Sequence, residues 1–481
     1  MSSLDFAVLL AYFLGLTALS HAVRPKSRDA ESYYLGGRQL PWPLVSLSII
    51  ATSISGVTFI GLPALVFAEA GDLRYLQFAL AALLAKGLLG VVLLPRFYAA
   101  GVASPYEYLT LRLGPRYGQA GTALFMLGAV LGQGVRVFAV ALVLELLTGW
   151  SLFWNIALIV GLSAVHMGHG GLRAVVWTDA VQALLLLAGG AFALLLATTE
   201  GPGSLSALFT QAEAAGKLRA FDASLNPALS FTLWTALLAM PVQNLAAYGG
   251  DQINTQRMLA CPSLGAARKA LYTSLLGEGI TALFLLVGLA LWAYYDVHPL
   301  SGFFEAAVAE KGDRIFPAFI LEVMPEGLRG LVIAAVFAAA MSSLDSVLSA
   351  LAQVSEKLSG KRGGAGPRWV GLWALLLGAF ALALSQGGGE LVPLAYQMTA
   401  FSYPPLLGLL LLAAFARPQA LRWPRLATAA AMLTVAALLP LTTGPEARLA
   451  FPWLFPLGLG VFLLVAVAPP PKRPDGRPRP S

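Results

Sequence analysis

Two adjacent hydroxyls lie close to a carboxylate in residues 337–346, which read FAAAMSSLDS. Ala339, Ser342 and Ser343 have i, i+3, i+4 spacing, so they share one face of a helix. Oxygen ligands are preferred by hard cations, and we extend that preference to sodium. This face therefore predicts half of a sodium coordination shell. The alternative is that both serine hydroxyls bond back to carbonyls of their own helix.

An interrupted apolar stretch, residues 43–68, predicts the other half of that shell. Its centre, 51–58, reads ATSISGVT, and a glycine and a proline follow shortly afterwards. Small polar residues and breakers at mid-membrane expose backbone groups, which is tolerable only where they line a cavity or bind something. The freed carbonyls of Ala51 and Ile54 would complete the shell. Without this break, back-bonding would be the better interpretation of the two serines.

Charged residues inside apolar stretches are costly, and they usually mark an ion, proton or solute path. Asp345 and Ser346 extend the serine face by one turn. Asp179 has two interpretations, a cation site or a hydrated carboxylate near the membrane interface. Glu278 is a further buried carboxylate with no assignable partner, and Lys86 is interpreted as an interfacial or packed lysine.

Arg136 lies too deep in its apolar stretch for easy snorkelling, so it should face a partner or a wet cavity. A guanidinium fork is well shaped to hold a carboxylate or another anion of a solute. Equally, Arg136 could pair with Asp179 or Glu145 as a structural bridge. The sequence alone leaves both interpretations open.

Long apolar stretches recur from end to end of the chain. The 481 residues are 58% hydrophobic and only 11% charged, which excludes an ordinary soluble domain. Because a spanning helix needs about 20 apolar residues, we expect an all-α membrane protein in one transmembrane domain, residues 1–468. The thirteen expected spans are 4–23, 43–68, 75–98, 119–148, 151–167, 174–198, 229–250, 270–295, 328–356, 369–386, 391–416, 424–441 and 449–468. The first is read as a span and not as a removed signal peptide.

Positive charge gives these spans an orientation. With the N-terminus outside, 22 of the 31 Lys and Arg residues fall in inner segments, Arg257 among them. Seven fall in outer segments, and Lys86 and Arg136 lie within spans. The net charge of +7 therefore reflects topology and not a nucleic-acid surface. We expect residues 469–481, rich in Pro and Arg, to form a disordered cytoplasmic tail.

A second interrupted span, 229–250, contains Pro241, Gln243 and Asn244 before a Gly-Gly pair. It lies five spans after the first interrupted one, so the two run in opposite directions. Paired broken helices five spans apart predict two inverted five-helix repeats, 43–198 and 229–416, with a midplane site between them. The alternative is close helix packing through small residues.

Enzyme chemistry has little support in this chain. Its one cysteine, Cys261, excludes an internal disulfide and a thiolate metal cluster. There is no phosphate loop, nucleophile elbow or Cys/His ligand set, and His166 and His169 are read as an inner loop. We expect no organic cofactor, no nucleic acid and no obligatory protein partner. The remaining classes are a transporter of a small solute through the lipid bilayer, an uncoupled channel and a solute sensor.

Several stretches in a fixed order resemble the sodium:solute symporter family, over roughly residues 30 to 360. They are 33–38 (YYLGGR), 104–109 (SPYEYL), 170–175 (GGLRAV) leading to Thr178 and Asp179, 251–252 (DQ) with 256–257 (QR), and 338–346 (AAAMSSLDS). The resemblance implies the amino-acid transporter-like fold with two inverted repeats. It also implies sodium-driven symport into the cell, with Na⁺ as the coupling ion.

The resemblance also implies roles for individual residues. Its sodium ligands fall on Ala51, Ile54, Ala339, Ser342 and Ser343, in agreement with the helix-face argument. Relatives with a second sodium site place it here on Asp179, Asp345 and Ser346, with Ser342 shared. Some of these relatives carry serine where this chain has Asp345, so that position is open to a cation, a proton or a salt bridge.

Positions that contact the solute in the family fall on Ser53, Ser55, Thr58, Gln77, Asn244 and Tyr248. The inner-gate tyrosine of sugar-type relatives is replaced by Ala247, which weakens a sugar assignment. Residues 313–317 (DRIFP) resemble the organic-anion side of the family. With Arg136 as a positive anchor, we expect a small organic anion or carboxylate. The alternative is sodium symport of a neutral amino acid, sugar or polyol.

Overall fold

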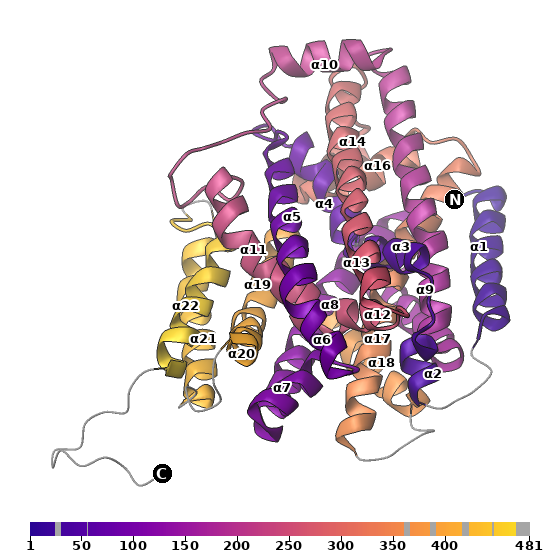
Figure 1. Ribbon diagram of the computed structural model, residues 1–481. Helices are drawn as coiled ribbons and strands as arrows, with labels where there is room; N and C mark the ends of the chain where they lie inside the picture. Colours follow the sequence, from indigo (N-terminus) through magenta and orange to yellow (C-terminus); the bar gives the residue numbers. More distant parts are fainter. Residues whose placement is uncertain are drawn as a thin grey trace, which may run out of the picture.

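The computed structural model describes residues 1–24, 30–54, 56–359, 366–384, 391–415, 423–444 and 447–467. Helices and the turns between them account for this part of the chain, which contains no strand. Figure 1 shows the helices gathered into one bundle. In chain order the α-helices are α1 (Ser3–Ala22), α2 (Ala30–Leu35), α3 (Trp42–Ser53), α4 (Gly56–Phe67), α5 (Phe78–Leu88), α6 (Leu94–Ala100), α7 (Pro105–Leu113), α8 (Pro115–Thr148), α9 (Leu152–Glu200), α10 (Leu205–Ala214), α11 (Met240–Leu245), α12 (Gln252–Leu259), α13 (Leu264–Thr273), α14 (Gly277–Val297), α15 (Gly302–Glu310), α16 (Ile315–Glu322), α17 (Leu328–Leu358), α18 (Gly366–Ala383), α19 (Leu391–Ala400), α20 (Tyr403–Phe415), α21 (Pro424–Leu438) and α22 (Leu454–Val467). The expected tail at 469–481 lies outside the described residues.

Long apolar helices dominate the bundle. Seven helices of the described part are long and apolar enough to cross a membrane, and two bent pairs raise that number to nine. Three expected spans appear as shorter apolar helices, at Leu152–Met167, Pro367–Ala383 and Phe451–Val467. Together these helices confirm an all-α architecture for the described residues. The number of thirteen spans stays a prediction.

The break expected in the second span is confirmed. Helix α3 ends at Ser53, α4 begins at Gly56, and the two are bent by 56°. Ile54 closes α3 with its N–H on the carbonyl of Ile50, so the carbonyls from Ala51 onward belong to the turn that an α-helix leaves without intrahelical partners. The sequence therefore located the break, and the use of the Ala51 and Ile54 carbonyls as ligands stays a prediction.

The seventh expected span is not broken in the same way. Its helix runs through two π-helical segments, Thr235–Ala239 and Ala246–Gly250, which flank the short helix α11. Pro241 has no N–H to donate, and the loss of that bond is accommodated by looser winding and not by a bend. The second sharp bend, of 46°, instead separates α19 from α20. The sequence predicts the second break in 229–250, where proline and glycine cluster, but the sharp bend lies between α19 and α20.

Helix α9 joins the fifth and sixth expected spans through a kink at Gly171. This residue has φ 58° and ψ −172°, and a Cβ there would lie 2.7 Å from the carbonyl oxygen of Tyr33. The close approach explains why a glycine stands opposite the 33–38 stretch. The inner loop expected at His166 is wrong, because this histidine is helical and lies 3.0 Å from the hydroxyl of Thr17.

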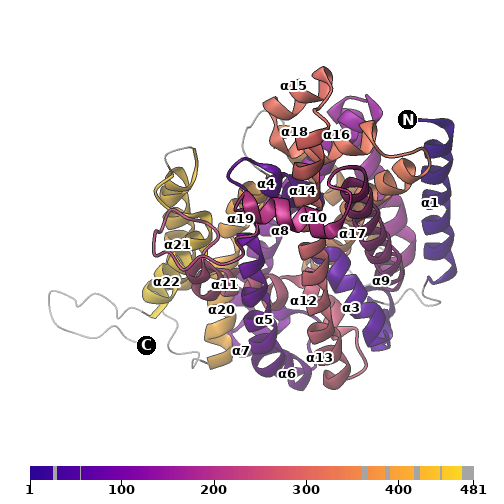
Figure 2. The ribbon, with the colours of Figure 1, turned by 90° about the horizontal axis from the view of Figure 1, so that it is seen from above.

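The most buried helix is α17, which carries the expected serine pair. It packs against α9, α18 and α1, and 94% of the residues in its apolar stretch are buried inside the protein. Figures 1 and 2 place α1 and the pair α21–α22 at opposite edges of the bundle. Helix α14 approaches α4 closely, since a Cβ on Gly288 would lie 2.5 Å from the Pro63 carbonyl. The broken helix is therefore held among the most enclosed elements.

Lys217 fastens the segment between α10 and α11 to the end of α4. Its Nζ donates to the carbonyls of Ala68 (2.8 Å), Val66 (3.0 Å) and Gly71 (3.0 Å), and the side chain is only 4% exposed. An ammonium is well placed here, because carbonyls at a helix C-terminus carry partial negative charge. Burial lowers the pKa of Lys217, while Asp72 nearby opposes that shift.

We expect Lys217→Met to destabilise the protein by about 2 kcal/mol, because hydrogen bonds from a charged group are lost and several carbonyls stay buried. Thermal unfolding of the detergent-solubilised protein measures the change. Lys269→Met, on the exposed surface of α13, is the matched control and should leave the midpoint unchanged. Equal midpoints for the two variants would show that the carbonyl cage contributes nothing.

Candidate functional site

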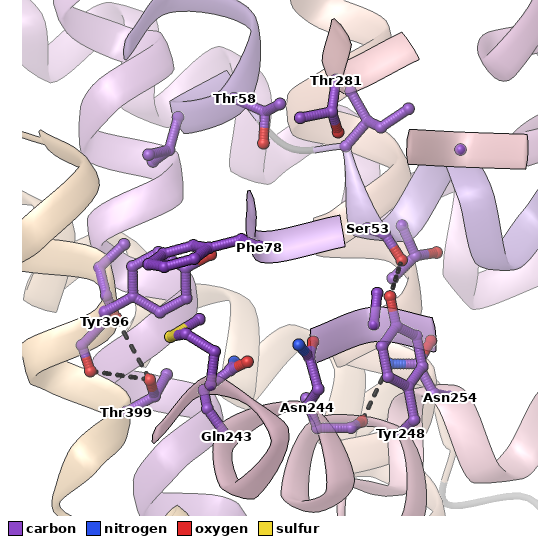
Figure 3. A pocket seen from close by; sticks show the side chains of 18 of the residues that line it. Ser53, Thr58, Phe78, Gln243, Asn244, Tyr248, Asn254, Thr281, Tyr396 and Thr399 are labelled. Atoms are coloured by element: carbon purple, nitrogen blue, oxygen red, sulfur yellow. Dashed lines mark hydrogen bonds between the residues drawn. The ribbon is translucent and has the colours of Figure 1, made fainter. Parts of the chain in front are cut away.

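A cavity of about 170 Å³ lies beside the break between α3 and α4. Its wall combines the two broken half-helices with α5, α8, α11, α14, α19 and α20. Figure 3 shows its polar side chains converging from these elements. The residues that give it chemical character are Ser53, Thr58, Lys86, Arg136, Gln243, Asn244, Tyr248, Asp251, Glu278, Thr281, Tyr396, Thr399 and Tyr403.

Many polar groups of this wall have no protein partner. Within the described residues, no side-chain hydrogen bond is made by Thr58, Gln243, Asn244 or Thr281, all of which are half-buried. In Figure 3, Thr58 and Thr281 lie at one end of the cavity, and Gln243 and Asn244 lie across it. Half-buried donors and acceptors that are unused by the protein are available to a ligand or to ordered water. The cavity is therefore suited to a small polar solute.

Helix α3, which ends with the expected sodium ligands Ala51 and Ile54, packs against α17, which carries the other three. Ala51, Ile54, Ala339, Ser342 and Ser343 are all buried. Ser343 Oγ is an interior atom without a hydrogen-bond partner among the described residues, so the back-bond to its own helix, which was the alternative interpretation, is not formed. An oxygen left in this state beside freed helix-end carbonyls fits a cation ligand set. Ser342 instead donates to Asp179 Oδ1 at 2.6 Å.

Asp179 is the centre of a buried network that joins four helices. Its Oδ2 accepts from Arg257 at 2.9 Å and from Ser48 at 2.5 Å. The same guanidinium donates to Ser48 Oγ at 2.6 Å and to Ser346 Oγ. Asp179 and Arg257 are both 0% exposed, so the guanidinium is a fixed positive charge separated by one carboxylate from the expected cation ligand Ser342. Helices α3, α9, α12 and α17 are thereby connected through charge-assisted hydrogen bonds.

The geometry agrees with what comparison with known proteins shows. Residues 33–357 match the sequence model of the sodium:solute symporter family. This chain belongs to that family. The apolar helices and the family together indicate a multi-pass membrane protein of the transporter class and not an enzyme.

Individual members of the symporter family give the comparison more detail. Sodium-coupled monocarboxylate transporter 2 of Bos taurus is 32% identical over 73% of this chain and 57% of its own length. A putative sodium-dependent multivitamin transporter of Drosophila melanogaster is 31% identical over 73% of this chain and 57% of its own length. The chain thus spans somewhat more than half of these relatives. A solved Na⁺-coupled sialic acid symporter, substrate-bound and outward-open, shares the fold with a TM-score of 0.82, covering 97% of both chains at 23% identity.

Arg136 lines the cavity of this symporter-family chain, together with the carboxylate of Asp251. Neither expected bridge partner contacts it, because Asp179 pairs with Arg257 and Glu145 Oε1 accepts from the backbone of Leu152 at 3.0 Å. Within the described residues, Arg136 makes no ion pair or side-chain hydrogen bond. The bridge interpretation is therefore not borne out, and the guanidinium is available to a solute.

The other solute positions implied by the family are partly brought together. Ser53, Thr58, Asn244 and Tyr248 line the cavity, and Ser53 Oγ lies 3.0 Å from Tyr248 Oη (Figure 3). Ser55 lies outside the described residues. Four of the six positions therefore lie on one cavity surface.

Gln77 has a different environment from the four positions that line the cavity. Its Nε2 donates to the carbonyl of Phe231 at 3.0 Å, and its Oε1 accepts from the N–H of Asp222 at 3.2 Å. Asp222 is also paired with Arg74 at 3.0 Å. In this conformation Gln77 anchors the segment before α11 and does not line the cavity.

The expected second cation position is divided in the structure. Ser346 joins the Asp179 network, but Asp345 does not, and its Oδ1 is buried without a hydrogen-bond partner in the described part of the chain. The positive group that faces Asp179 here is the guanidinium of Arg257. A second metal ion would therefore have to share Asp179 with Arg257 or displace it.

The sequence predicts other roles for two basic residues, one of which joins the Asp179 network while the other lines the cavity. Arg257 was counted among the inner charges, and Lys86 was read as interfacial or packed. Lys86 is 1% exposed and lines the cavity, with Nζ 3.2 Å from the Ser274 carbonyl and 4.6 Å from the ring centre of Tyr248. The available signal was its place inside an apolar span, together with Glu278 in another.

Removing one partner of the Asp179–Arg257 pair should destabilise the protein more than removing both partners. We expect Asp179→Asn to destabilise the protein by about 3 kcal/mol, because it strands a buried guanidinium. Asp179→Asn combined with Arg257→Met should recover a large part of that loss. Thermal unfolding in detergent measures all three proteins, with exposed Glu326→Gln as the control. A double variant no more stable than Asp179→Asn alone would mean that the two charges do not stabilise each other.

Proposed function

We propose that this chain is a sodium-driven symporter that carries a small organic anion into the cell. The observation that carries the proposal is the unpaired guanidinium of Arg136 in a cavity that begins at a broken helix. A fork of N–H donors matches the two oxygens of a carboxylate. The relatives named monocarboxylate transporters support the same class of solute.

We propose Ala51, Ile54, Ala339, Ser342 and Ser343 as the sodium ligands. Sodium held there would join the end of α3 to α17 and fix the direction in which the broken helix points. Since Ser53 and Thr58 flank the same break, fixing α3 also shapes the solute cavity. Sodium binding would thereby raise solute affinity without a contact between them, and linkage requires the reverse effect as well.

The energy for uptake would come from sodium moving down its gradient. Each positive charge that crosses a potential of ~100 mV contributes about 2.3 kcal/mol. One sodium with one carboxylate is electrically neutral, so only the concentration gradient would drive that stoichiometry. A second cation at Asp179, Asp345 and Ser346 would add the electrical contribution, and it would have to compete with Arg257.

We further propose the full topology. It has thirteen spans in a single domain, 1–468, with inverted repeats at 43–198 and 229–416. The protein spans the inner membrane of the cell. Its N-terminus lies outside and its C-terminus lies in the cytoplasm. The charge distribution and the fold shared with the solved symporter support this arrangement.

A neutral solute is the second candidate, favoured by one observation. Two carboxylates, Asp251 and Glu278, line the cavity together with the two basic residues, so its formal charges can balance without a solute. Asp251 accepts a hydrogen bond from Tyr403 at 3.0 Å. A cavity of that kind would suit an amino acid, sugar or polyol.

Uptake into proteoliposomes decides between the candidates. We expect a radiolabelled short carboxylate such as propanoate to accumulate with an inward sodium gradient and not with an equal choline gradient. Carboxylates that fail to accumulate while neutral amino acids, sugars or polyols do so would overturn the anion assignment. Equal uptake in both gradients would identify an uncoupled channel.

A further inference from the structure

Asp251 is a buried carboxylate that has no role in the proposed sodium or anion site. It is 4% exposed, lines the cavity with Arg136, and stands between the π-helical segment Ala246–Gly250 and helix α12. Its Oδ1 accepts from the N–H of Ile253 at 2.8 Å, and its Oδ2 accepts from the hydroxyl of Tyr403 at 3.0 Å. Because a carboxylate offers about four acceptor sites, these two hydrogen bonds leave part of its capacity free.

Helix α20 brings Asp251 and Arg136 to the same part of the cavity. This helix begins at Tyr403 and packs both against α8, which carries Arg136, and against the π-helical segment before Asp251. The positive charge of Arg136 acts on both Asp251 and Tyr403. Glu278, the other carboxylate of the cavity wall, interacts with Lys86 instead. Asp251 is therefore the carboxylate of this wall that is placed to neutralise Arg136.

The guanidinium of Arg136 needs a negative charge at each step of a transport cycle. Under the proposed function, bound solute supplies its own carboxylate. After release the carrier returns empty, and a half-buried guanidinium among apolar helices is costly without a partner. In the conformation described, Arg136 makes no ion pair within the described residues. A carboxylate that reaches Arg136 once the solute has left would lower the cost of the return step.

We propose that Asp251 is the internal counter-ion of the empty carrier. When the solute carboxylate leaves Arg136, the carboxylate of Asp251 exchanges the hydroxyl of Tyr403 for the guanidinium. When solute binds again, it displaces Asp251, which returns to Tyr403. This inference rests on the proposed anion function, and it assigns to Asp251 the return step on which net uptake depends.

The backbone around Asp251 is suited to such a movement. The residue is extended, with φ −78° and ψ 129°, and it joins a π-helical segment to a short α-helix. Residues at the ends of elements are the positions that absorb changes of φ and ψ. Helix α12 also carries Arg257, whose partner Asp179 bonds to the proposed sodium ligand Ser342. A movement of Asp251 would therefore reach the sodium ligands through one short helix.

Two transport assays on the same proteoliposomes separate the return step from the rest of the cycle. Net uptake of radiolabelled propanoate, driven by an inward sodium gradient, requires the empty carrier to return. Exchange of radiolabelled for unlabelled propanoate, with equal sodium on both sides, does not require that step, because the carrier returns with solute on Arg136. Protein-free liposomes correct both rates for leakage through the lipid.

Asp251→Asn should raise the ratio of exchange to net uptake by about tenfold, as expected when a hydrogen-bonded charge pair is lost from the empty carrier alone. Asn caps a helix as well as Asp does, so the variant loses the charge and keeps the cap of α12. Exposed Glu326→Gln is the matched control, and its ratio should equal that of the parent protein. An unchanged ratio in Asp251→Asn would overturn the counter-ion role.

Affinity provides a second measurement that does not depend on turnover. A solute that has to displace Asp251 binds more weakly than one that meets a free guanidinium. Isothermal calorimetry in sodium-containing detergent should therefore show tighter binding of propanoate to Asp251→Asn than to the parent protein. Tyr403→Phe, which releases Asp251 towards Arg136, should bind propanoate more weakly. Tyr272→Phe, on the exposed surface of α13, is the matched control and should bind propanoate as the parent does.

Failure of the two proposals gives different results. If the parent protein neither binds nor carries carboxylates, the anion function is wrong, and the counter-ion role falls with it. If the parent protein carries propanoate but the ratio of exchange to net uptake is unchanged in Asp251→Asn, only the counter-ion role is wrong. If Asp251→Asn does not fold, Tyr403→Phe decides, and an affinity equal to that of the parent protein or higher would overturn the role of Asp251.

Discussion

Arg136→Gln should reduce the affinity of carboxylates for this protein by about a hundredfold. A guanidinium that meets a carboxylate in a cavity forms charge-assisted hydrogen bonds, and truncating one partner of such a pair costs about 2–5 kcal/mol. Arg136 makes no side-chain hydrogen bond or ion pair among the described residues, so its loss breaks no internal salt bridge. The measurement is inhibition of sodium-driven uptake by a panel of carboxylates in parent and variant proteoliposomes.

The matched control for this experiment is Arg136→Lys. It keeps the charge but loses the planar fork, so carboxylate affinity should fall to an intermediate value. The sodium concentration for half-maximal uptake should change little in both variants, since Arg136 belongs to no sodium ligand set. If only uncharged solutes compete in the parent protein, the anion assignment is wrong.

Ser343→Ala should raise the sodium concentration for half-maximal uptake by about tenfold, equivalent to about 1.4 kcal/mol. The hydroxyl of Ser343 is buried and unpartnered within the described residues, so its removal costs no protein hydrogen bond. The folded state should keep its stability while one oxygen ligand is lost. Uptake of the identified solute at varied sodium, with thermal unfolding alongside, measures both quantities.

Ser342→Ala separates two effects that share one residue. It should raise the same sodium requirement and also destabilise the fold, because Ser342 donates to Asp179 at 2.6 Å. Ser349→Ala, on the same helix but facing Gln256 at 3.4 Å, is the control and should leave the sodium dependence unchanged. Unchanged sodium dependence in both Ser342→Ala and Ser343→Ala would remove the sodium site from this helix face.

The positive charge of Arg257 lies close to the proposed sodium ligand Ser342 and would affect sodium binding there. Arg257 and Ser342 both bond to Asp179, so a fixed guanidinium and a mobile sodium would be neighbours along one carboxylate. Like charges at that separation repel, and the repulsion is strong in an interior of low dielectric constant. Asp179 would offset this repulsion for one of the two cations, so under the proposed ligand set the release of sodium would depend on the position of α12.

The sequence by itself determined the class of protein and the break that organises its site. Hydrophobicity along 481 residues predicts a membrane bundle of helices, because a backbone inside the bilayer must form its hydrogen bonds internally. The run 51–58 located the break, and i, i+3, i+4 spacing placed Ala339, Ser342 and Ser343 on one face. These are local properties of composition and helical period, which do not depend on what packs alongside.

The tertiary structure alone decided which charges meet. Arg257 and Ser48 are 209 residues apart, and Arg257 and Asp179 are 78 apart, yet all three share one network. From the sequence alone, Arg257 is one of the inner positive charges that orient the spans, and Asp179 is a candidate partner of Arg136. Pairing of buried charges depends on the close approach of α3, α9, α12 and α17. Periodicity contains no information on that approach, because it describes one helix at a time.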